Sequence, residues 1–138
     1  LPKIRAGSVE NILVVDDEHG MRMLHTRYIK RMLPEVNVLH ASDGAEALRI
    51  AREFNPKVII SDNDMPDIDG EEMVRKLKAD PSTSNIPVII VTGQDSDSNR
   101  ETLKQYGAFA ILTKPVTPEQ LSDILKKIES GEAILTDK

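Results

Sequence analysis

The sequence contains no cysteine, no apolar run longer than a few residues, and no cluster of lysine and arginine. Without cysteine, disulfides and thiolate zinc sites are excluded, and a reducing compartment, the cytoplasm, is the expected location. The short apolar runs predict no membrane-spanning segment, and Leu1-Pro2-Lys3 is not expected to begin a signal peptide. The net charge of -5 and the pI near 5.2 disfavour direct binding of nucleic acid, which requires clustered basic side chains.

Several ligand-binding motifs are also missing. Neither G-x-G-x-x-G nor a P-loop follows the first predicted strand, so nucleotide binding by those routes is excluded. The acidic stretch around Gly70 does not form an EF-hand, because with Gly70 at loop position six the ligand positions one and twelve would be Met65 and Lys76. The histidines lack metal-ligand spacing. We interpret all of them as surface or helix-face residues: His19, His25 and His40.

The chain has enough apolar material for one domain of modest size. It contains 138 residues, of which 39% are hydrophobic. Residues 1–10 mix proline, glycine, serine and basic residues without periodicity, and we expect a leader or linker there. Residues 11–129 are expected to fold, and the tail of residues 130–138 is too short for a second domain.

Five apolar runs of strand length alternate with five stretches of helical periodicity. The predicted strands lie at residues 12–15, 36–41, 57–62, 87–92 and 109–113. Each is followed by a predicted helix, and the helices lie at about 21–32, 45–54, 70–79, 98–106 and 118–128. This alternation indicates a parallel sheet covered by helices on both faces. We therefore expect an α/β fold, a flavodoxin-like three-layer sandwich with five strands in the order 2-1-3-4-5.

The predicted helices differ in the quality of their signals. Asp17 is placed to cap the first helix, and Thr117 with Gln120 forms a capping box at the start of the last. The fourth helix, at about 98–106, has few apolar anchors, and we expect it to be loosely held.

Two predicted strands end on carboxylates. Asp16 and Asp17 follow the first strand, and Asp62 ends the third. In the order 2-1-3-4-5 these strands are neighbours where the winding reverses, which is where open parallel sheets bind ligands. Two unit charges about 4 Å apart repel by about 4 kcal/mol at an effective dielectric of about 20, so three carboxylates require protons or a cation. Oxygen-only ligands at an open site favour Mg²⁺.

The fourth and fifth strands end at Thr92 and just before Lys114, respectively. A hydroxyl and an ammonium group beside the carboxylates could hold the oxygens of a phosphoryl group, with Asp62 as the nucleophile. Each residue alone has a simpler interpretation: a solvated lysine, a turn hydroxyl, or, for Asp17, a helix cap. Their combined placement at strand ends carries the hypothesis.

These residues resemble the motifs of the receiver domains of two-component response regulators, which accept phosphoryl groups from phosphohistidine. The resemblance covers residues 11–129. It rests on these motifs, in this order: Asp16-Asp17, Asp62, Met65-Pro66, Asp69-Gly70, Thr92-Gly93 and Lys114-Pro115.

The resemblance implies roles for the residues at the strand ends. Asp62 would be phosphorylated, and Mg²⁺ would be ligated by Asp17, Asp62 and the backbone carbonyl of Asp64, with Asp16 acting through water. The phosphoryl group would be contacted by Lys114 and approached by Thr92, with Gly93 leaving the approach open. The Lys114–Pro115 bond would be cis. The donor would be a histidine kinase or a histidine phosphotransfer protein, and the signal would pass to an unknown downstream protein.

One position departs from the family pattern. Three residues before Lys114 the family usually carries tyrosine or phenylalanine, whereas this chain has Ile111. Phe109 would share a face of the strand with Ile111 unless the strand is bulged. We therefore expect phosphorylation without the usual coupling of threonine to an aromatic residue, and a signal that passes through residues 93–98 and the helix after them.

Alternative functions remain open at this point. Asp62-Asn63-Asp64 is similar to the paired aspartates of haloacid-dehalogenase-like phosphatases, but there the pair follows the first strand and here it follows the third. Ile111 and the sparse fourth helix also suit a phosphorylation-independent binding module, against which the intact acidic residues argue. The receiver itself is not expected to be an enzyme beyond its own phosphorylation and dephosphorylation. It could stand alone, form a homodimer, or be part of a larger regulator or hybrid kinase.

Overall fold

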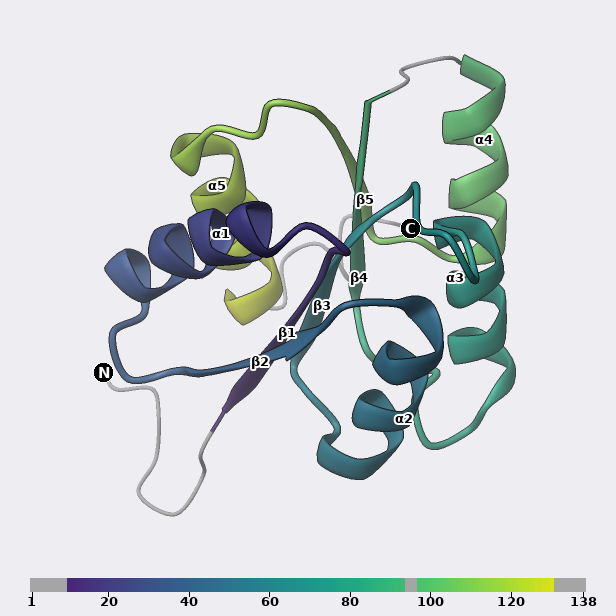
Figure 1. Cartoon of the computed structure of the whole chain (residues 1–138), viewed down its shortest axis with the longest axis horizontal. Coiled ribbons are helices and arrows are strands. Elements are labelled where there is room, and N and C mark those ends of the chain that lie inside the picture. Colours follow the sequence, from purple (N-terminus) through teal and green to yellow (C-terminus); the bar gives the residue numbers. More distant parts are fainter. Residues whose placement is uncertain (1–9, 94–96, 131–138) are drawn as a thin grey trace.

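The computed structural model describes residues 10–93 and 97–130 of the chain. Five strands alternate with five helices in this part (Figure 1). The strands are β1 (Asn11–Val15), β2 (Asn37–Ala41), β3 (Val58–Asp62), β4 (Val88–Thr92) and β5 (Ala110–Thr113). The helices are α1 (His19–Met32), α2 (Gly44–Phe54), α3 (Gly70–Ala79), α4 (Asp97–Tyr106) and α5 (Pro118–Ser130).

The strands form one parallel sheet in the order β2-β1-β3-β4-β5, which confirms the predicted fold. Helices α1 and α5 cover one face, and α2, α3 and α4 cover the other (Figure 1). In the register of the sheet, Val15 lies opposite Ser61, and Asp62 lies opposite Val91. The carboxyl ends of β1, β3 and β4 therefore meet at one edge of the sheet.

The central strands are buried on both faces, which explains why their sequences are continuous apolar runs. Every residue of β3 and β4 is buried. Alternate side chains enter different cores: Ile59 packs on the α2, α3 and α4 side, whereas Val58 and Ile60 pack on the α1 and α5 side. This burial holds the strand end that carries Asp62 in a fixed position.

The helix starts confirm one predicted cap and correct another. The capping box of α5 is present: the Gln120 N–H donates to Thr117 Oγ1 (3.1 Å), and the Thr117 N–H donates to Gln120 Oε1 (3.0 Å). The prediction that Asp17 caps α1 was wrong. The cap position is Glu18, whose side chain makes no capping hydrogen bond. Asp17 lies one residue too early to cap a helix that begins at His19.

Helix α4 has the predicted extent within one residue, and Leu103, one of its few apolar residues, is fully buried. The guanidinium carbon of Arg75 on α3 also lies 5.5 Å from the centre of the Tyr106 ring.

None of the helices in the described part of the chain has the length and apolar character needed to cross a membrane.

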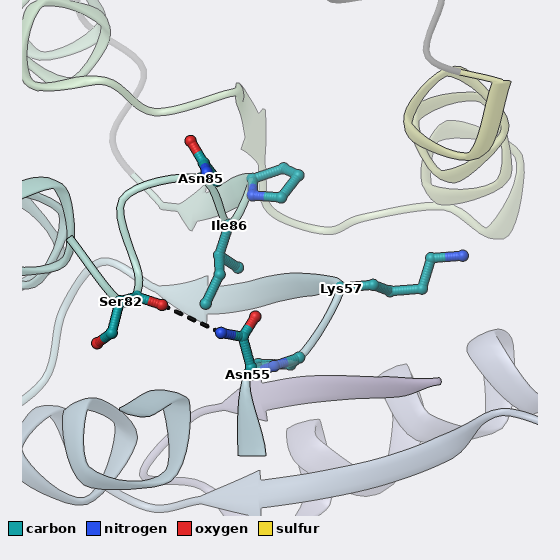
Figure 2. Close-up of a pocket in the computed structure, with 7 residues that line it drawn as sticks. Asn55, Lys57, Ser82, Asn85 and Ile86 are labelled. Carbon is teal, nitrogen blue, oxygen red and sulfur yellow. Dashed lines mark hydrogen bonds between the residues drawn. The ribbon is translucent and has the colours of Figure 1, made fainter. Parts of the chain in front are cut away.

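A surface pocket of about 360 Å³ lies between the amino-terminal ends of β3 and β4 (Figure 2). Asn55, Lys57, Ser82 and Ile86 are among its lining residues, and the Asn55 side-chain amide donates to the Ser82 carbonyl (3.1 Å). None of the predicted site residues lines this pocket, which lies at the edge of the sheet opposite the carboxylates.

Candidate functional site

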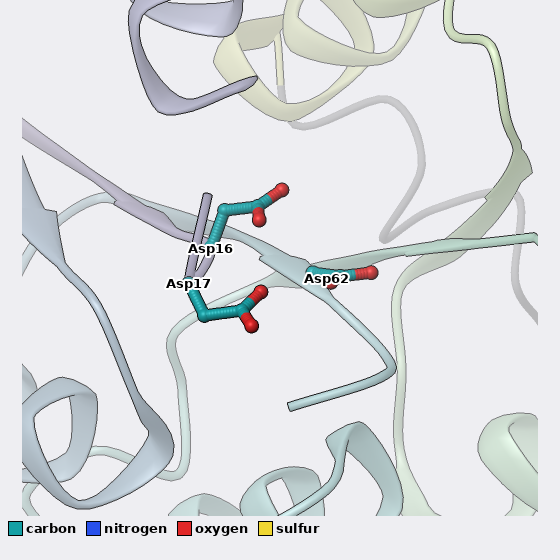
Figure 3. Close-up of side chains that lie close together, drawn as sticks. All are labelled: Asp16, Asp17 and Asp62. Carbon is teal, nitrogen blue, oxygen red and sulfur yellow. The ribbon is translucent and has the colours of Figure 1, made fainter. Parts of the chain in front are cut away.

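Three carboxylates meet at the carboxyl ends of β1 and β3. Oxygen atoms of Asp16, Asp17 and Asp62 all lie within 4.8 Å of one another (Figure 3). Asp16 and Asp62 are only 2% and 5% exposed, because they sit at the ends of buried strands, whereas Asp17 is exposed. The group is therefore buried on one side and open to solvent on the other.

A lysine from the fifth strand end reaches this group. Lys114 Nζ lies 3.0 Å from Asp62 Oδ1. The backbone N–H of Lys114 donates to the Thr92 carbonyl (2.8 Å), which fixes the start of the loop after β5 against the end of β4. Burial is the largest influence and lowers the pKa of Lys114, but the hydrogen bond and charge of Asp62, with Asp16 and Asp64, raise that pKa overall. Lys114 is therefore a permanent cation in the site.

The same surroundings that favour the charged form of Lys114 disfavour the charged form of Asp16. Burial is the main reason that the pKa of the Asp16 carboxyl is raised, and the charges of Asp62 and Asp17 also raise it. The Glu18 N–H donates to Asp16 Oδ1 (2.9 Å), and this bond and the charge of Lys114 oppose the rise without cancelling it. The three carboxylates thus carry more negative charge than the one ammonium group of Lys114 can neutralise.

The other predicted residues lie at the neighbouring strand ends. Thr92 is fully buried at the end of β4, opposite Thr113 in the register. Gly93 is exposed, and a Cβ atom built there would meet Lys114 Cδ no closer than 4.0 Å. Asp64 is exposed in the loop between β3 and α3. The peptide bond between Lys114 and Pro115 is cis.

Ile111 lies apart from the acidic group. It is 7% exposed and belongs to the hydrophobic core on the side of α2, α3 and α4. Its backbone carbonyl lies 3.4 Å from the Arg100 guanidinium of α4. The structure therefore places Ile111 as a core residue under α4.

Two residues near the site were missed or misjudged from the sequence. Asp67 binds backbone N–H groups at the start of α2, and its only sequence signal is its position among the acids of an aspartate-rich loop. His25 lies on the buried face of α1 with 3% exposure, so the helix-face interpretation holds for it and the surface interpretation is wrong. Its spacing of four residues from the buried Ile29 was the available signal.

The arrangement suits a hard divalent cation. Every acidic ligand in the group offers oxygen, one side is open, and three carboxylates face one ammonium group. Mg²⁺ prefers such sites, where it keeps waters and can share its coordination with a phosphate. Asp62 is the carboxylate that contacts Lys114, so a phosphoryl group on Asp62 would have a cation beside it.

Comparison with known proteins identifies related sequences and structures. Residues 12–126 match the family described as "Response regulator receiver domain". Protein PilH of Pseudomonas aeruginosa is 35% identical over 120 residues, covering 87% of this chain and 98% of PilH. Response regulator PleD of Caulobacter vibrioides is 40% identical over 106 residues, covering 76% of this chain but only 23% of PleD. Chemotaxis response regulator CheY4 of Vibrio cholerae has a structure similar to this one, with a TM-score of 0.78 and 30% identity over 87% of this chain and 98% of CheY4.

Proposed function

Because this chain belongs to the response regulator receiver domain family of two-component signalling, we propose that Asp62 accepts a phosphoryl group from phosphohistidine in a Mg²⁺-dependent reaction. The observation that carries the proposal is the position of Asp62. Its carboxylate lies 3.0 Å from the Lys114 ammonium and within 4.8 Å of two further carboxylates. This combination provides both a nucleophile and charge for the transferred group.

The surrounding residues take separate parts in this reaction. Asp17, Asp62 and the backbone carbonyl of Asp64 would hold Mg²⁺, with Asp16 acting through water. When bound, the cation supplies positive charge to the phosphoryl oxygens. An Asp62 oxygen forms the new bond to phosphorus while the bond from phosphorus to the donor's imidazole nitrogen breaks. Lys114 neutralises charge on the phosphoryl oxygens.

Thr92 and Gly93 serve the phosphorylated state. The Thr92 hydroxyl would move toward the new phosphoryl group, and the absence of a side chain at Gly93 leaves the approach to Asp62 open. Thr92 is the last residue of β4 and Gly93 directly follows it, and β4 is the neighbour of the strand that carries Asp62. A change at Thr92 would therefore reach the segment that leads into α4.

The partners follow from the chemistry of the donor. A histidine kinase or a histidine phosphotransfer protein would supply the phosphoryl group, and an unknown downstream protein would respond. Residues 11–129 would form the receiver; apart from Glu10 and Ser130, the proposed leader of residues 1–10 and tail of residues 130–138 lie outside the described residues. The chain would catalyse only its own phosphorylation and dephosphorylation. The absence of cysteine suits the cytoplasm, and the charge of -5 suits a protein partner better than nucleic acid.

Intact-mass measurement tests the proposal directly. The protein is incubated with MgCl₂ and acetyl phosphate, and we expect a mass increase of one phosphoryl group. Asp62→Asn should abolish the increase because it removes the nucleophilic oxygen. Asp69→Asn is the matched control, since the Asp69 carboxylate accepts the Glu72 N–H at the start of α3 and does not belong to the acidic group.

Two outcomes would contradict the proposal. One is a wild-type protein that gains no mass, which would favour a binding module that works without phosphorylation. The other is an Asp62→Asn variant that gains mass as readily as the wild type. Sustained turnover of phosphomonoesters by the wild type would instead support a phosphatase.

A further inference from the structure

The loop between β3 and α3 is bound to a distant part of the chain. The Gly44 N–H donates to Asp67 Oδ1 and the Ala45 N–H donates to Asp67 Oδ2, both at 3.0 Å. These groups are separated by 23 and 22 residues in the sequence. Because each carboxylate oxygen takes a different N–H, the contact fixes the orientation of the loop as well as its distance from α2.

The start of α2 has donors available for such a contact. The first N–H groups of a helix have no partner within it, and they favour negative charge. Among the described residues, the Asp43 side chain at the cap position accepts only the Glu46 N–H (2.8 Å). The N–H groups of Gly44 and Ala45 are taken by Asp67, a residue of another segment. Asp67 therefore completes a helix end that the helix's own cap leaves unfinished.

The close packing of the same two segments is an independent observation. A Cβ atom at Gly44 would lie 2.8 Å from Ile68 Cβ and 3.1 Å from the Ile68 carbonyl oxygen. Real Cβ atoms essentially never come that close, so only glycine lets the loop approach α2 at this distance. The loop is thus held against α2 by packing at Ile68 as well as by the Asp67 carboxylate.

The loop and the start of α2 are each connected to a strand end that carries part of the acidic group. The Asp16 N–H donates to the carbonyl of Ala41, which ends the strand before α2 (3.1 Å). The loop begins at Asn63, directly after Asp62, and the Asn63 N–H donates to the Val91 carbonyl (2.9 Å). The start of α2 is therefore connected both to Asp16 and, through Asp67, to the loop that contains Asp64.

We infer that Asp67 is a positioning residue for the cation site. It holds the loop backbone at Asp64 in place relative to Asp16 and Asp17, although its own carboxylate does not belong to the acidic group. The inference rests on the proposed function, because the cation is the one that phosphorylation of Asp62 requires. Without the Asp67 contact, the loop would have to be ordered when Mg²⁺ binds, and affinity would fall.

Titration with Mg²⁺, followed by amide NMR chemical shifts, tests this inference, since the chain has no tryptophan to report binding. We expect Asp67→Ala to weaken Mg²⁺ binding by about tenfold, the scale of losses when a residue that orients a metal ligand is removed. Asp67→Asn keeps one acceptor oxygen and should give a smaller loss. Hydrogen exchange at Gly44 and Ala45 should be slow in the wild type and faster in Asp67→Ala.

Asp43→Ala is the matched control. It removes a carboxylate from the same helix end but leaves the Asp67 contact to the loop intact. We expect Asp43→Ala to lower the melting temperature and to leave the Mg²⁺ dissociation constant within twofold of the wild type. This difference separates positioning of the site from general loss of stability.

The outcomes distinguish this inference from the proposed function. If the wild type does not bind Mg²⁺, both are overturned. If the wild type binds Mg²⁺ and Asp67→Ala binds it equally well, only the role of Asp67 is overturned. The same holds if Asp43→Ala and Asp67→Ala weaken binding by equal factors, or if exchange at Gly44 and Ala45 is unchanged in Asp67→Ala.

Discussion

Single residues in the site show an unequal balance of charge. Asp16 and Asp62 are almost fully buried, yet among the described residues Lys114 forms an ion pair only with Asp62. The pKa of Asp16 is raised, mainly by burial and also by the charges of Asp62 and Asp17, so the charged form of Asp16 is disfavoured in the site. A buried charge that is only partly compensated is costly, so the site suits a cation at the expense of stability when no cation is bound.

His25 is a further buried titratable residue, and its burial predicts that stability depends on pH. Burial is the main cause that lowers the pKa of His25; the charge of Lys114 also lowers it, and that of Asp62 opposes this. The unfolded chain therefore holds more protons between the folded pKa and the ordinary value of about 6.5, so stability is lost as the pH falls through that range. We expect the free energy of unfolding in urea to decrease from about pH 7.5 to about pH 5.5. His25→Leu should reduce this decrease.

His19→Gln provides the control for this prediction, because His19 is exposed on the first turn of the same helix. The pKa of His40 is also lowered, mainly by burial, so the stability of His25→Leu should still depend on pH to some extent. If the free energy of unfolding falls with pH as much in His25→Leu as in the wild type, His25 is not a source of the pH dependence.

At the scale of elements, α4 is attached by a few specific contacts. Leu103 is its fully buried apolar anchor, and Tyr106 lies under Arg75 of α3. Toward the sheet, the Arg100 guanidinium reaches the Ile111 carbonyl (3.4 Å) and Thr113 Oγ1 (3.3 Å). Thr113 directly precedes Lys114, so α4 is connected to the strand that carries the lysine of the site.

We predict that Arg100→Met loosens α4, because methionine keeps the apolar part of the side chain but cannot donate to β5. The loss of these hydrogen bonds should lower the free energy of unfolding by about 0.5–1.5 kcal/mol. Amide hydrogen exchange in α4 should become faster while exchange in α2 stays unchanged. Lys104→Met is the control, since Lys104 is exposed on the same helix. Equal exchange in the wild type and Arg100→Met would show that these contacts do not hold α4.

The elements could be predicted from local sequence, whereas several contacts could not. Apolar runs and caps such as Thr117 depend on neighbours within a few residues, so the five strands and the α5 capping box were predicted correctly. The strand order was also predicted correctly, but from the alternation of strands and helices, which favours the flavodoxin-like order. The error at Asp17 arose because a cap depends on the residue at which the helix begins. The contact of Asp67 with α2 joins segments more than twenty residues apart, and no local pattern encodes that distance.

In the whole molecule, the carboxyl ends and the amino ends of the strands carry different groups of charged residues. The carboxyl edge carries the acidic group and Lys114. At the opposite edge, Lys57 Nζ lies 2.7 Å from Glu10 Oε1, just before β1, and 3.5 Å from Glu129 Oε2 near the end of α5. These ion pairs are only partly exposed and join both ends of the described chain. The unfavourable charge of the site is thus separated from the contacts that close the fold.

We predict that Mg²⁺ stabilises the entire fold, because the three carboxylates come together only in the folded chain. A cation that binds only the folded state adds about 2.7 kcal/mol to the free energy of unfolding at a concentration of 100 times its dissociation constant. Urea unfolding with MgCl₂, and with EDTA and NaCl at equal ionic strength, measures the difference. Removal of Mg²⁺ should lower stability, and Asp16→Asn should be more stable than the wild type without Mg²⁺, because it removes a buried, repelled charge.

Asp123→Asn is the control for net charge, since Asp123 is exposed on α5 and outside the acidic group. It should gain as much stability from Mg²⁺ as the wild type, because its three site carboxylates are intact. Asp16→Asn should gain less from Mg²⁺ than either, since one carboxylate of the site has lost its charge. An equal gain in all three proteins would mean that Mg²⁺ acts on the surface generally, and that the three carboxylates do not form its site.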